Sequence, residues 1–273
     1  MNLDQLKERV LRVGTRVEDH PEYGLRVKRE DLSCREPGPP FSKTRGVFAH
    51  MAKLPQGTTV GVLDTYHSQA GHAVAHSGAA LGLRVVNYYP EYKRDPGHRE
   101  PQERAYELGA VLKGLPAGRS AILYHQAKKD LAHWFNQPYM MPNALKLSET
   151  VDETAAEVRL LEDIPERVII PASSATIAAG VIRGFKDIGA SPEFIVHMGY
   201  SRSHDAVKKY LQGYVGEVDV TLIDEGYGYK DQAKPGETPP WPCNPYYDLK
   251  AFRWWKKNQQ DLPQATTLFW NVG

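Results

Sequence analysis

The 273-residue sequence predicts an α/β fold built on mostly parallel sheets that are covered by helices on both faces. Short apolar runs alternate with stretches of helical spacing along most of the chain. These runs are apolar throughout, as is typical of strands buried on both faces, whereas half-exposed strands alternate between apolar and polar residues. Hydrophobic residues make up 41% and charged residues 25% of the chain, as in ordinary globular proteins.

In the first half, three strands are expected to alternate with helices. Residues 58–63 (TTVGVL) form a β-branched apolar run and predict a strand. Small residues at 69–81 predict a helix that Gly82 ends. Residues 84–89 (RVVNYY) predict a second strand, helical spacing follows at 102–112, and SAILY at 120–124 predicts a third strand.

The second half continues the same alternation. Apolar periodicity predicts helices at 149–161, 177–188, 203–211 and 251–258. Short apolar runs between them predict strands at 167–170, 193–197, 218–223 and 266–271. Two segments, residues 34–42 and 229–246, contain too many prolines for a helix or a central strand and are predicted to be loops.

Composition excludes several classes of protein. With 34 basic and 33 acidic side chains the formal charge is +1, which argues against a strongly basic nucleic-acid-binding surface. No apolar run approaches the ~20 residues of a membrane helix. The charged N-terminal segment does not resemble a signal peptide, and two cysteines, Cys34 and Cys243, form no disulfide framework. A cytoplasmic protein is therefore expected.

Three segments carry polar residues in positions that suit a binding site. Residues 169–185 (IIPASSATIAAGVIRGF) predict a strand, a loop of very small residues and a helix beginning at Thr176. Backbone N–H groups and hydroxyls at such a helix start can hold a phosphate, although a plain capped turn is an alternative. In residues 27–50 a KRED run precedes Ser42-Lys43-Thr44-Arg45, and the strand at 58–63 leads to Ser68-Gln69. Polar residues at that end of a parallel strand face the ligand crevice.

Taken in order, these motifs resemble the fold-type-II (tryptophan synthase β-like) family of pyridoxal-phosphate enzymes. The resemblance runs from Val27 to the end of the chain and is strongest with the branch of ACC deaminase and D-cysteine desulfhydrase. It implies two three-layer α/β/α domains, a large one from residues 1–45 plus 146–273 and a small one from 46–145. The cofactor, pyridoxal 5′-phosphate, is expected in the crevice between them.

The resemblance also assigns roles to individual residues. It implies that Lys43 carries the Schiff base, that Gln69 contacts the cofactor O3′, and that Ser68 orients the substrate carboxylate or relays a proton. Tyr227 and Tyr247 are expected on the substrate side of the ring. The phosphate loop, which has lost the glycines of the family to Ala and Ser, maps to Ser173, Ser174, Ala175 and Thr176.

Asp248 is the expected partner of the ring nitrogen. Many members of the fold place a hydroxyl on the last strand there, but the matching residue is Val272, which has no hydrogen-bonding side chain. A carboxylate keeps the ring nitrogen protonated and favours chemistry through a Cα carbanion. The alternative for Asp248 is an ordinary acid in the first turn of a helix.

The expected function is a pyridoxal-phosphate-dependent lyase that forms a Cα carbanion on an amino acid or amine-bearing substrate, by deamination, elimination or decarboxylation. ACC itself is disfavoured, because Ala70 replaces a Gln that contacts the substrate carboxylate in ACC deaminase. One alternative is a phage-type tailoring enzyme, such as a decarboxylase, acting on an amino acid attached to a nucleotide or DNA base; the helix containing Trp254 and Trp255 beside two lysines fits that reading. Another is a catalytically idle scaffold.

The partners expected are a small amine or amino-acid substrate and a second copy of the chain, since the family implies a homodimer. Nucleic acid stays open as a partner, and no membrane contact is expected. His72 and His76 are spaced as on metalloprotease helices but lack the HExxH acid, so no metal is predicted.

Overall fold

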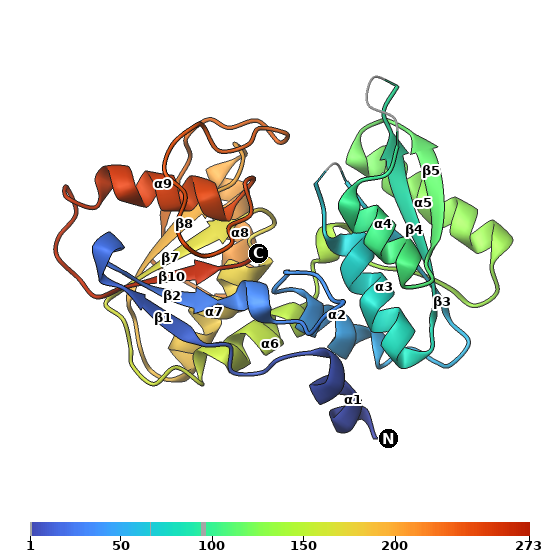
Figure 1. Ribbon diagram of the computed structural model, residues 1–273, viewed down its shortest axis with the longest axis horizontal. Coiled ribbons are helices and arrows are strands. Elements are labelled where there is room, and N and C mark those ends of the chain that lie inside the picture. Colours follow the sequence, from blue (N-terminus) through green and yellow to red (C-terminus); the bar gives the residue numbers. More distant parts are fainter. Residues whose placement is uncertain (1, 66, 94–96) are drawn as a thin grey trace. The chain divides into compact units, whose positions relative to one another are not determined.

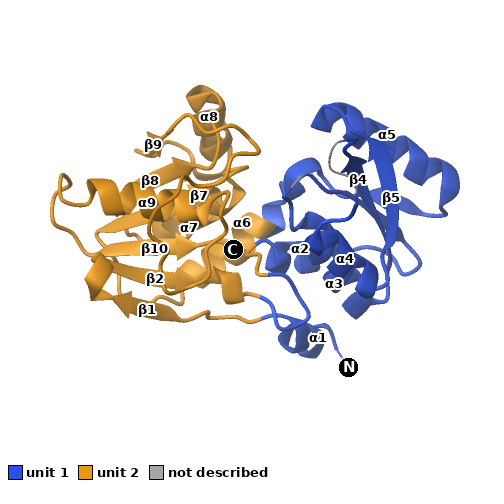
Figure 2. Ribbon diagram, turned by 45° about the horizontal axis from the view of Figure 1, so that its top comes forward, with its two compact units in different colours: residues 1–11, 34–39, 43–149 blue, residues 12–33, 40–42, 150–273 orange. Residues whose placement is uncertain are grey.

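The computed structural model describes residues 2–65, 67–93 and 97–273 and divides into two compact units (Figures 1 and 2). Unit 1 contains residues 1–11, 34–39 and 43–149, and unit 2 contains residues 12–33, 40–42 and 150–273. Each unit has its own sheet. The domain division expected from the sequence stays a prediction.

The sheet of unit 2 has six strands in the order β1-β2-β10-β7-β8-β9. All neighbours run parallel except β1 and β2, which pair antiparallel. The last strand in the sequence therefore lies inside the sheet, between β2 and β7. The strands are β1 Val17–His20, β2 Leu25–Arg29, β7 Arg167–Ala172, β8 Glu193–Met198, β9 Thr221–Ile223 and β10 Thr267–Asn271.

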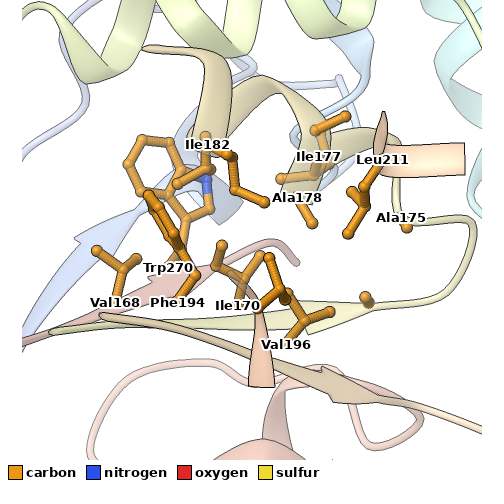
Figure 3. Packing of buried hydrophobic residues seen from close by; sticks show 14 of the residues in the cluster. Val168, Ile170, Ala175, Ile177, Ala178, Ile182, Phe194, Val196, Leu211 and Trp270 are labelled. Atoms are coloured by element: carbon orange, nitrogen blue, oxygen red, sulfur yellow. The ribbon is translucent and has the colours of Figure 1, made fainter. Parts of the chain in front are cut away.

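Helices cover both faces of this sheet. Successive residues of a strand point to opposite faces, so Val168 and Ile170 join one core and Ile169 joins the other. The first core, shown in Figure 3, packs the sheet against α7 and α8, and the second packs it against α9. The unit is thus three-layered. Its helices are α6 Ser148–Val158, α7 Thr176–Asp187, α8 His204–Val215 and α9 Asp248–Asn258. The first two residues of α6 belong to unit 1, and the rest of this helix, from Thr150, belongs to unit 2.

Unit 1 contains an all-parallel sheet in the order β5-β4-β3-β6. On one face, Leu123, Ala127 and Leu131 of α5 pack against Val86 and Tyr88 of β4. The opposite face is covered by α3, where Gly78 lets the helix approach Val85 closely. The elements are β3 Thr59–Leu63, β4 Arg84–Glu91, β5 Val111–Pro116, β6 Pro138–Met140, α1 Leu3–Val10, α2 Thr44–Met51, α3 Ala70–Leu81, α4 Glu100–Glu107 and α5 Ser120–Trp134.

Most predicted elements are confirmed to within a few residues, but two predictions need correction. The strand predicted at 120–124 is wrong, because these residues begin α5. The helix predicted at 102–112 ends at Glu107, and residues from Val111 form β5. Residues 34–42 and 229–246 contain no helix or strand, as expected from their prolines. In the described ranges, no helix is long and apolar enough to cross a membrane.

Candidate active site

The predicted phosphate loop lies between the end of β7 and the start of α7. The hydroxyls of Ser174 and Thr176 share a hydrogen bond of 2.9 Å, and Thr176 shares a second one, also 2.9 Å, with the hydroxyl of Tyr210. The side chain of Ser173 bonds the Tyr247 hydroxyl. The hydroxyls of Ser173, Ser174 and Thr176 thus lie at the start of α7, an arrangement that suits a phosphate group. We call the loop Ser173–Thr176 the phosphate cup.

Ala175 has the left-handed conformation that normally belongs to glycine. Its φ is +65°, and it occupies the position before the first residue of α7 with an exposed fraction of 2%. The left-handed conformation is less favourable by roughly 1–2 kcal/mol for an L-residue. Such strained conformations persist at sites where the surrounding structure fixes the backbone. The cup therefore keeps the backbone geometry of a glycine loop after losing its glycines.

This conformation predicts how residue 175 tolerates substitution. Ala175→Val is expected to lower the free energy of unfolding by about 2–3 kcal/mol, because a β-branched residue fits the left-handed region poorly. Ala175→Gly is the matched control and should change it by less than about 1 kcal/mol. Denaturant unfolding of the cofactor-free protein measures both variants. Equal stability of the Val and Gly variants would contradict the left-handed assignment.

Asp248 is a fully buried carboxylate at the start of α9. Its oxygens accept hydrogen bonds from the backbone N–H groups of Val272 (2.8 Å) and Asn244 (3.3 Å), not from its own helix, so it is not an ordinary helix cap. Burial raises the pKa of Asp248 to about 7, and the charge of Asp31 acts in the same direction. No salt bridge from a described residue reaches Asp248. A buried acid of this kind fits a cationic ring nitrogen.

The segment that leads to the predicted Schiff-base lysine is attached to the same strand end. The Ser42 N–H donates to the carbonyl of Val272 at 3.0 Å, so one residue, Val272, bonds both Asp248 and Ser42. Lys43 is the next residue in the chain. Within unit 2, this backbone connection therefore places Ser42 beside the strand end that also holds Asp248.

Lys43 itself belongs to unit 1 and is 9% exposed. Its Nζ donates a 2.8 Å hydrogen bond to the carbonyl of Ala144. Ala144 and the following Leu145 both have left-handed φ angles, of 59° and 48°. Two consecutive non-glycine residues of this kind are costly, and such strain concentrates at functional sites. The carbonyl of Ala144 is thus an acceptor built for the Lys43 amine.

Ser68 and Gln69 lie together at the start of α3, where β3 ends. The Ser68 hydroxyl accepts a 3.0 Å hydrogen bond from the Ala70 N–H and bonds Asp64. Asp64 is fully buried and also accepts from Gly71 N–H and the Asn87 amide. Burial raises the pKa of Asp64 to about 6. Oε1 of Gln69 is buried and has no hydrogen-bond partner among the described residues, so it is available to a ligand.

The two predicted tyrosines differ in their surroundings. Tyr247 forms a hydrogen bond with the side chain of Ser173, a residue of the phosphate cup. Tyr227 is 8% exposed, and Nζ of Lys250 lies 4.3 Å from its ring centre. Burial lowers the pKa of Lys250 to about 8. The role of both tyrosines on the substrate side of the ring stays a prediction.

Two other sequence features have structural explanations. Nε2 of His72 bonds the carbonyl of Pro37 at 2.8 Å, and Nε2 of His76 bonds the carbonyl of Val10 at 3.3 Å. No cluster of three or more metal-binding side chains occurs in the described part of the chain. Trp255 is buried, and its indole N–H bonds the carbonyl of Tyr23. It is therefore part of the core rather than of an aromatic and basic surface for nucleic acid.

Sequence reasoning missed Arg202 and Tyr210, which lie in the loop after β8 and in α8. The signal was present in the segment Gly199-Tyr200-Ser201-Arg202-Ser203, where polar residues follow a parallel strand. Asp64 was missed in the same way after β3. Of the predicted residues, Lys43, Ser68 and Gln69 lie in unit 1, and the others in unit 2.

The chain was compared with known proteins. Residues 16–224 match the family model described as pyridoxal-phosphate dependent enzyme. A protein of Pseudomonas phage M6 named glycyl-dTMP PLP-dependent decarboxylase is 48% identical over 260 residues, which cover 90% of this chain and 93% of that protein.

Solved structures share the fold at low sequence identity. An ACC deaminase homologue has a TM-score of 0.79 at 17% identity, covering 100% of this chain and 95% of that chain. A fungal L-serine ammonia-lyase from Rhizomucor miehei has a TM-score of 0.72 at 14% identity, covering 97% and 94%. These likenesses confirm the predicted fold type II.

The described residues fit the chemical groups of the expected cofactor. The hydroxyls of the phosphate cup suit its phosphate, and the uncompensated Asp248 suits its ring nitrogen. Lys43 supplies a buried primary amine for its aldehyde. The resemblance predicted from the sequence and the cofactor, pyridoxal 5′-phosphate, are thereby confirmed. The chain belongs to the family of pyridoxal-phosphate-dependent enzymes.

Proposed function

We propose that this protein is a lyase, a pyridoxal-phosphate-dependent decarboxylase whose substrate is a glycyl group carried by a thymidine nucleotide. The observation that carries the proposal is the 48% identity, over 90% of the chain, to the phage protein named glycyl-dTMP PLP-dependent decarboxylase. The phage-type alternative from the sequence is the one favoured.

In the proposed reaction the bond between Cα and the carboxylate breaks, carbon dioxide leaves, and Cα takes a proton. The bound cofactor supplies an electron-withdrawing ring that stabilises the electron pair left on Cα. Asp248 would hold the proton of the ring nitrogen, for which its buried carboxylate is suited. Lys43 would deliver the proton to Cα from Nζ, and the Ala144 carbonyl would hold the amine whenever it is not joined to the cofactor.

The contacts around the substrate carboxylate also favour its departure. Ala70 supplies a methyl group where ACC deaminases have a Gln that contacts this carboxylate. The Ser68 hydroxyl is already engaged by Asp64 and the Ala70 N–H. Strong hydrogen bonds to a carboxylate would stabilise the ground state more than the transition state, in which its charge disappears, so a sparse set of donors favours decarboxylation.

The test is to incubate the holoenzyme with glycyl-dTMP labelled in the carboxyl carbon. We expect one labelled carbon dioxide for each molecule of product, and a product that is lighter than the substrate by the mass of carbon dioxide. No ammonia should be released. Free glycine and ACC serve as comparison substrates and should react at least about 100-fold more slowly, because they lack the nucleotide. Release of ammonia would instead favour a deaminase, and a holoenzyme inert toward every amine would favour the idle scaffold.

The proposal includes a homodimer located in the cytoplasm. The family resemblance supports the dimer, and two cysteines that form no disulfide, Cys34 and Cys243, are in keeping with a reducing compartment. Light scattering of the purified holoenzyme distinguishes a dimer from a monomer.

A further inference from the structure

Two guanidinium nitrogens of Arg202 are buried without a hydrogen-bond partner among the described residues. It lies in the loop between β8 and α8, and its Nε and Nη2 form no hydrogen bond with any described residue. The guanidinium carbon is 5.8 Å from the centre of the Tyr200 ring, a contact that leaves both nitrogens unpaired. An arginine cannot lose its charge inside a protein, so unpaired buried nitrogens are unfavourable unless an anion binds them.

The loop of Arg202 is fixed beside the phosphate cup at both of its ends. At its beginning, the Gly199 N–H donates a 2.8 Å hydrogen bond to the carbonyl of Ala172, the residue before the cup. Beyond its end, Tyr210 of α8 bonds Thr176 of the cup at 2.9 Å. Burial raises the pKa of Tyr210 to about 12, and the positive charge of Arg202 acts in the opposite direction and lowers this pKa. Arg202 therefore lies close enough to Tyr210 to interact with its hydroxyl electrostatically. Arg202 and the cup are therefore parts of one cluster within unit 2.

The unpaired nitrogens also indicate the shape of the missing ligand. Nε and Nη2 form one edge of the planar guanidinium and point two N–H groups in the same direction. This edge binds two oxygens of one carboxylate or phosphate at once. The neighbouring cup offers three hydroxyls and the N-terminus of α7, which favour a doubly charged phosphate over a carboxylate. The cup has also lost the glycines whose backbone would approach a phosphate most closely, so an extra donor has a purpose here.

We propose that Arg202 binds the phosphate of the cofactor through its Nε and Nη2, and that Tyr210 positions Thr176 of the phosphate cup for the same group. The phosphate monoester of a nucleotide substrate has the same chemistry and is the competing source. The cofactor is favoured because Tyr210, in the helix after the loop, bonds Thr176 of the cup, and Gly199 bonds Ala172, directly before the cup.

The test measures cofactor affinity and needs no substrate. Fluorescence titration of the cofactor-free protein gives the Kd for pyridoxal phosphate and for pyridoxal, which lacks the phosphate. Arg202→Met is expected to weaken pyridoxal phosphate by about 10- to 100-fold, and Arg202→Lys by less, since it keeps the charge but loses the two-pronged edge. The Kd for pyridoxal should not change. Arg183→Met, at an exposed arginine of α7, is the matched control with unchanged affinities.

Three results would overturn the proposal. If Arg202→Met binds pyridoxal phosphate with an unchanged Kd, Arg202 does not contact the cofactor phosphate. A parallel loss for both ligands, together with a lower Tm of the cofactor-free protein, indicates a merely structural role; the proposal expects that Tm to stay or rise, because an unpaired buried charge is removed. An unchanged cofactor Kd with weaker binding of dTMP assigns Arg202 to the substrate. None of these readouts depends on decarboxylation, so the proposed reaction can fail independently.

Discussion

Lys43→Ala is expected to reduce kcat by about 10⁴-fold or more, because the proposed function makes its amine both the covalent attachment point and the proton donor. The same variant should lack the visible absorption band of the bound cofactor that borohydride abolishes. The hydrogen bond to the Ala144 carbonyl that the truncation removes is worth about 1 kcal/mol of stability. The loss would thus be chemical, and the folded structure would persist.

Steady-state kinetics and absorption spectra of the two proteins measure this effect. Lys53→Ala is the matched control, because Lys53 lies in the same unit with a side chain that is 67% exposed and paired with Glu149. It should keep the band and the activity. Adding a small primary amine, such as ethylamine, should restore part of the activity of Lys43→Ala but not of an unfolded variant. A full borohydride-sensitive band in Lys43→Ala would refute the assignment.

Asp248→Asn is expected to lower kcat by about 10²- to 10³-fold, because an amide cannot hold the ring nitrogen in its protonated form by charge. The same variant should change the pH dependence of stability in the cofactor-free protein. Burial raises the pKa of the native Asp248 to about 7 from an ordinary value of 3.8, so the native state binds this proton more tightly than the unfolded state. The stabilisation from protonation is complete below pH ~4 and is lost as the pH rises through 7.

For a difference of about three pH units, this linkage corresponds to about 4 kcal/mol as an upper bound. Between pH 4 and pH 8, the free energy of unfolding should therefore fall less for Asp248→Asn than for the natural protein. Part of the loss should remain, because burial also raises the pKa of Asp64 to about 6. Cofactor binding should remove most of the difference, since a cationic ring nitrogen favours the ionised acid.

Urea unfolding at several pH values, with and without cofactor, tests these expectations. Asp163→Asn is the control, because that side chain is 72% exposed and should leave the pH profile unchanged. If Asp248→Asn and the natural protein lost stability equally between pH 4 and pH 8, the raised pKa of Asp248 would be wrong. If Asp248→Asn lowered kcat but left the pH dependence of stability unchanged, the carboxylate would act on the ring nitrogen without having a raised pKa in the cofactor-free protein.

Strands β3 and β7 were predictable because burial on both faces leaves continuous apolar runs. Strand β1 was not, because its residues Val17–His20 lie at the sheet edge and include two acids. The strand predicted at residues 120–124 shows the limit of short runs. SAILY is apolar in either state, and the helix becomes evident only from Leu123, Ala127 and Leu131, which repeat every four residues.

The candidate site divides in the same way. The phosphate cup and Asp248 could be proposed from the sequence because their chemistry depends on residue types in an order that the sequence displays. The acceptor for the Lys43 amine could not, because any residue has a carbonyl and only the left-handed backbone at Ala144 directs this one. Arg202 could be noticed in the sequence, but its lack of partners depends on the tertiary structure.

The central position of β10 has a consequence for biosynthesis. During translation, β2 and β7 are made long before the strand that separates them, so both expose an unpaired edge until residues 267–271 appear. Residues 43–149, by contrast, are contiguous in the sequence and contain all four strands of their own sheet. One half of the nascent protein can mature early while the other remains open to aggregation and in need of chaperones. Because Val272 follows β10 directly, the acid site at Asp248 is also among the last parts to form.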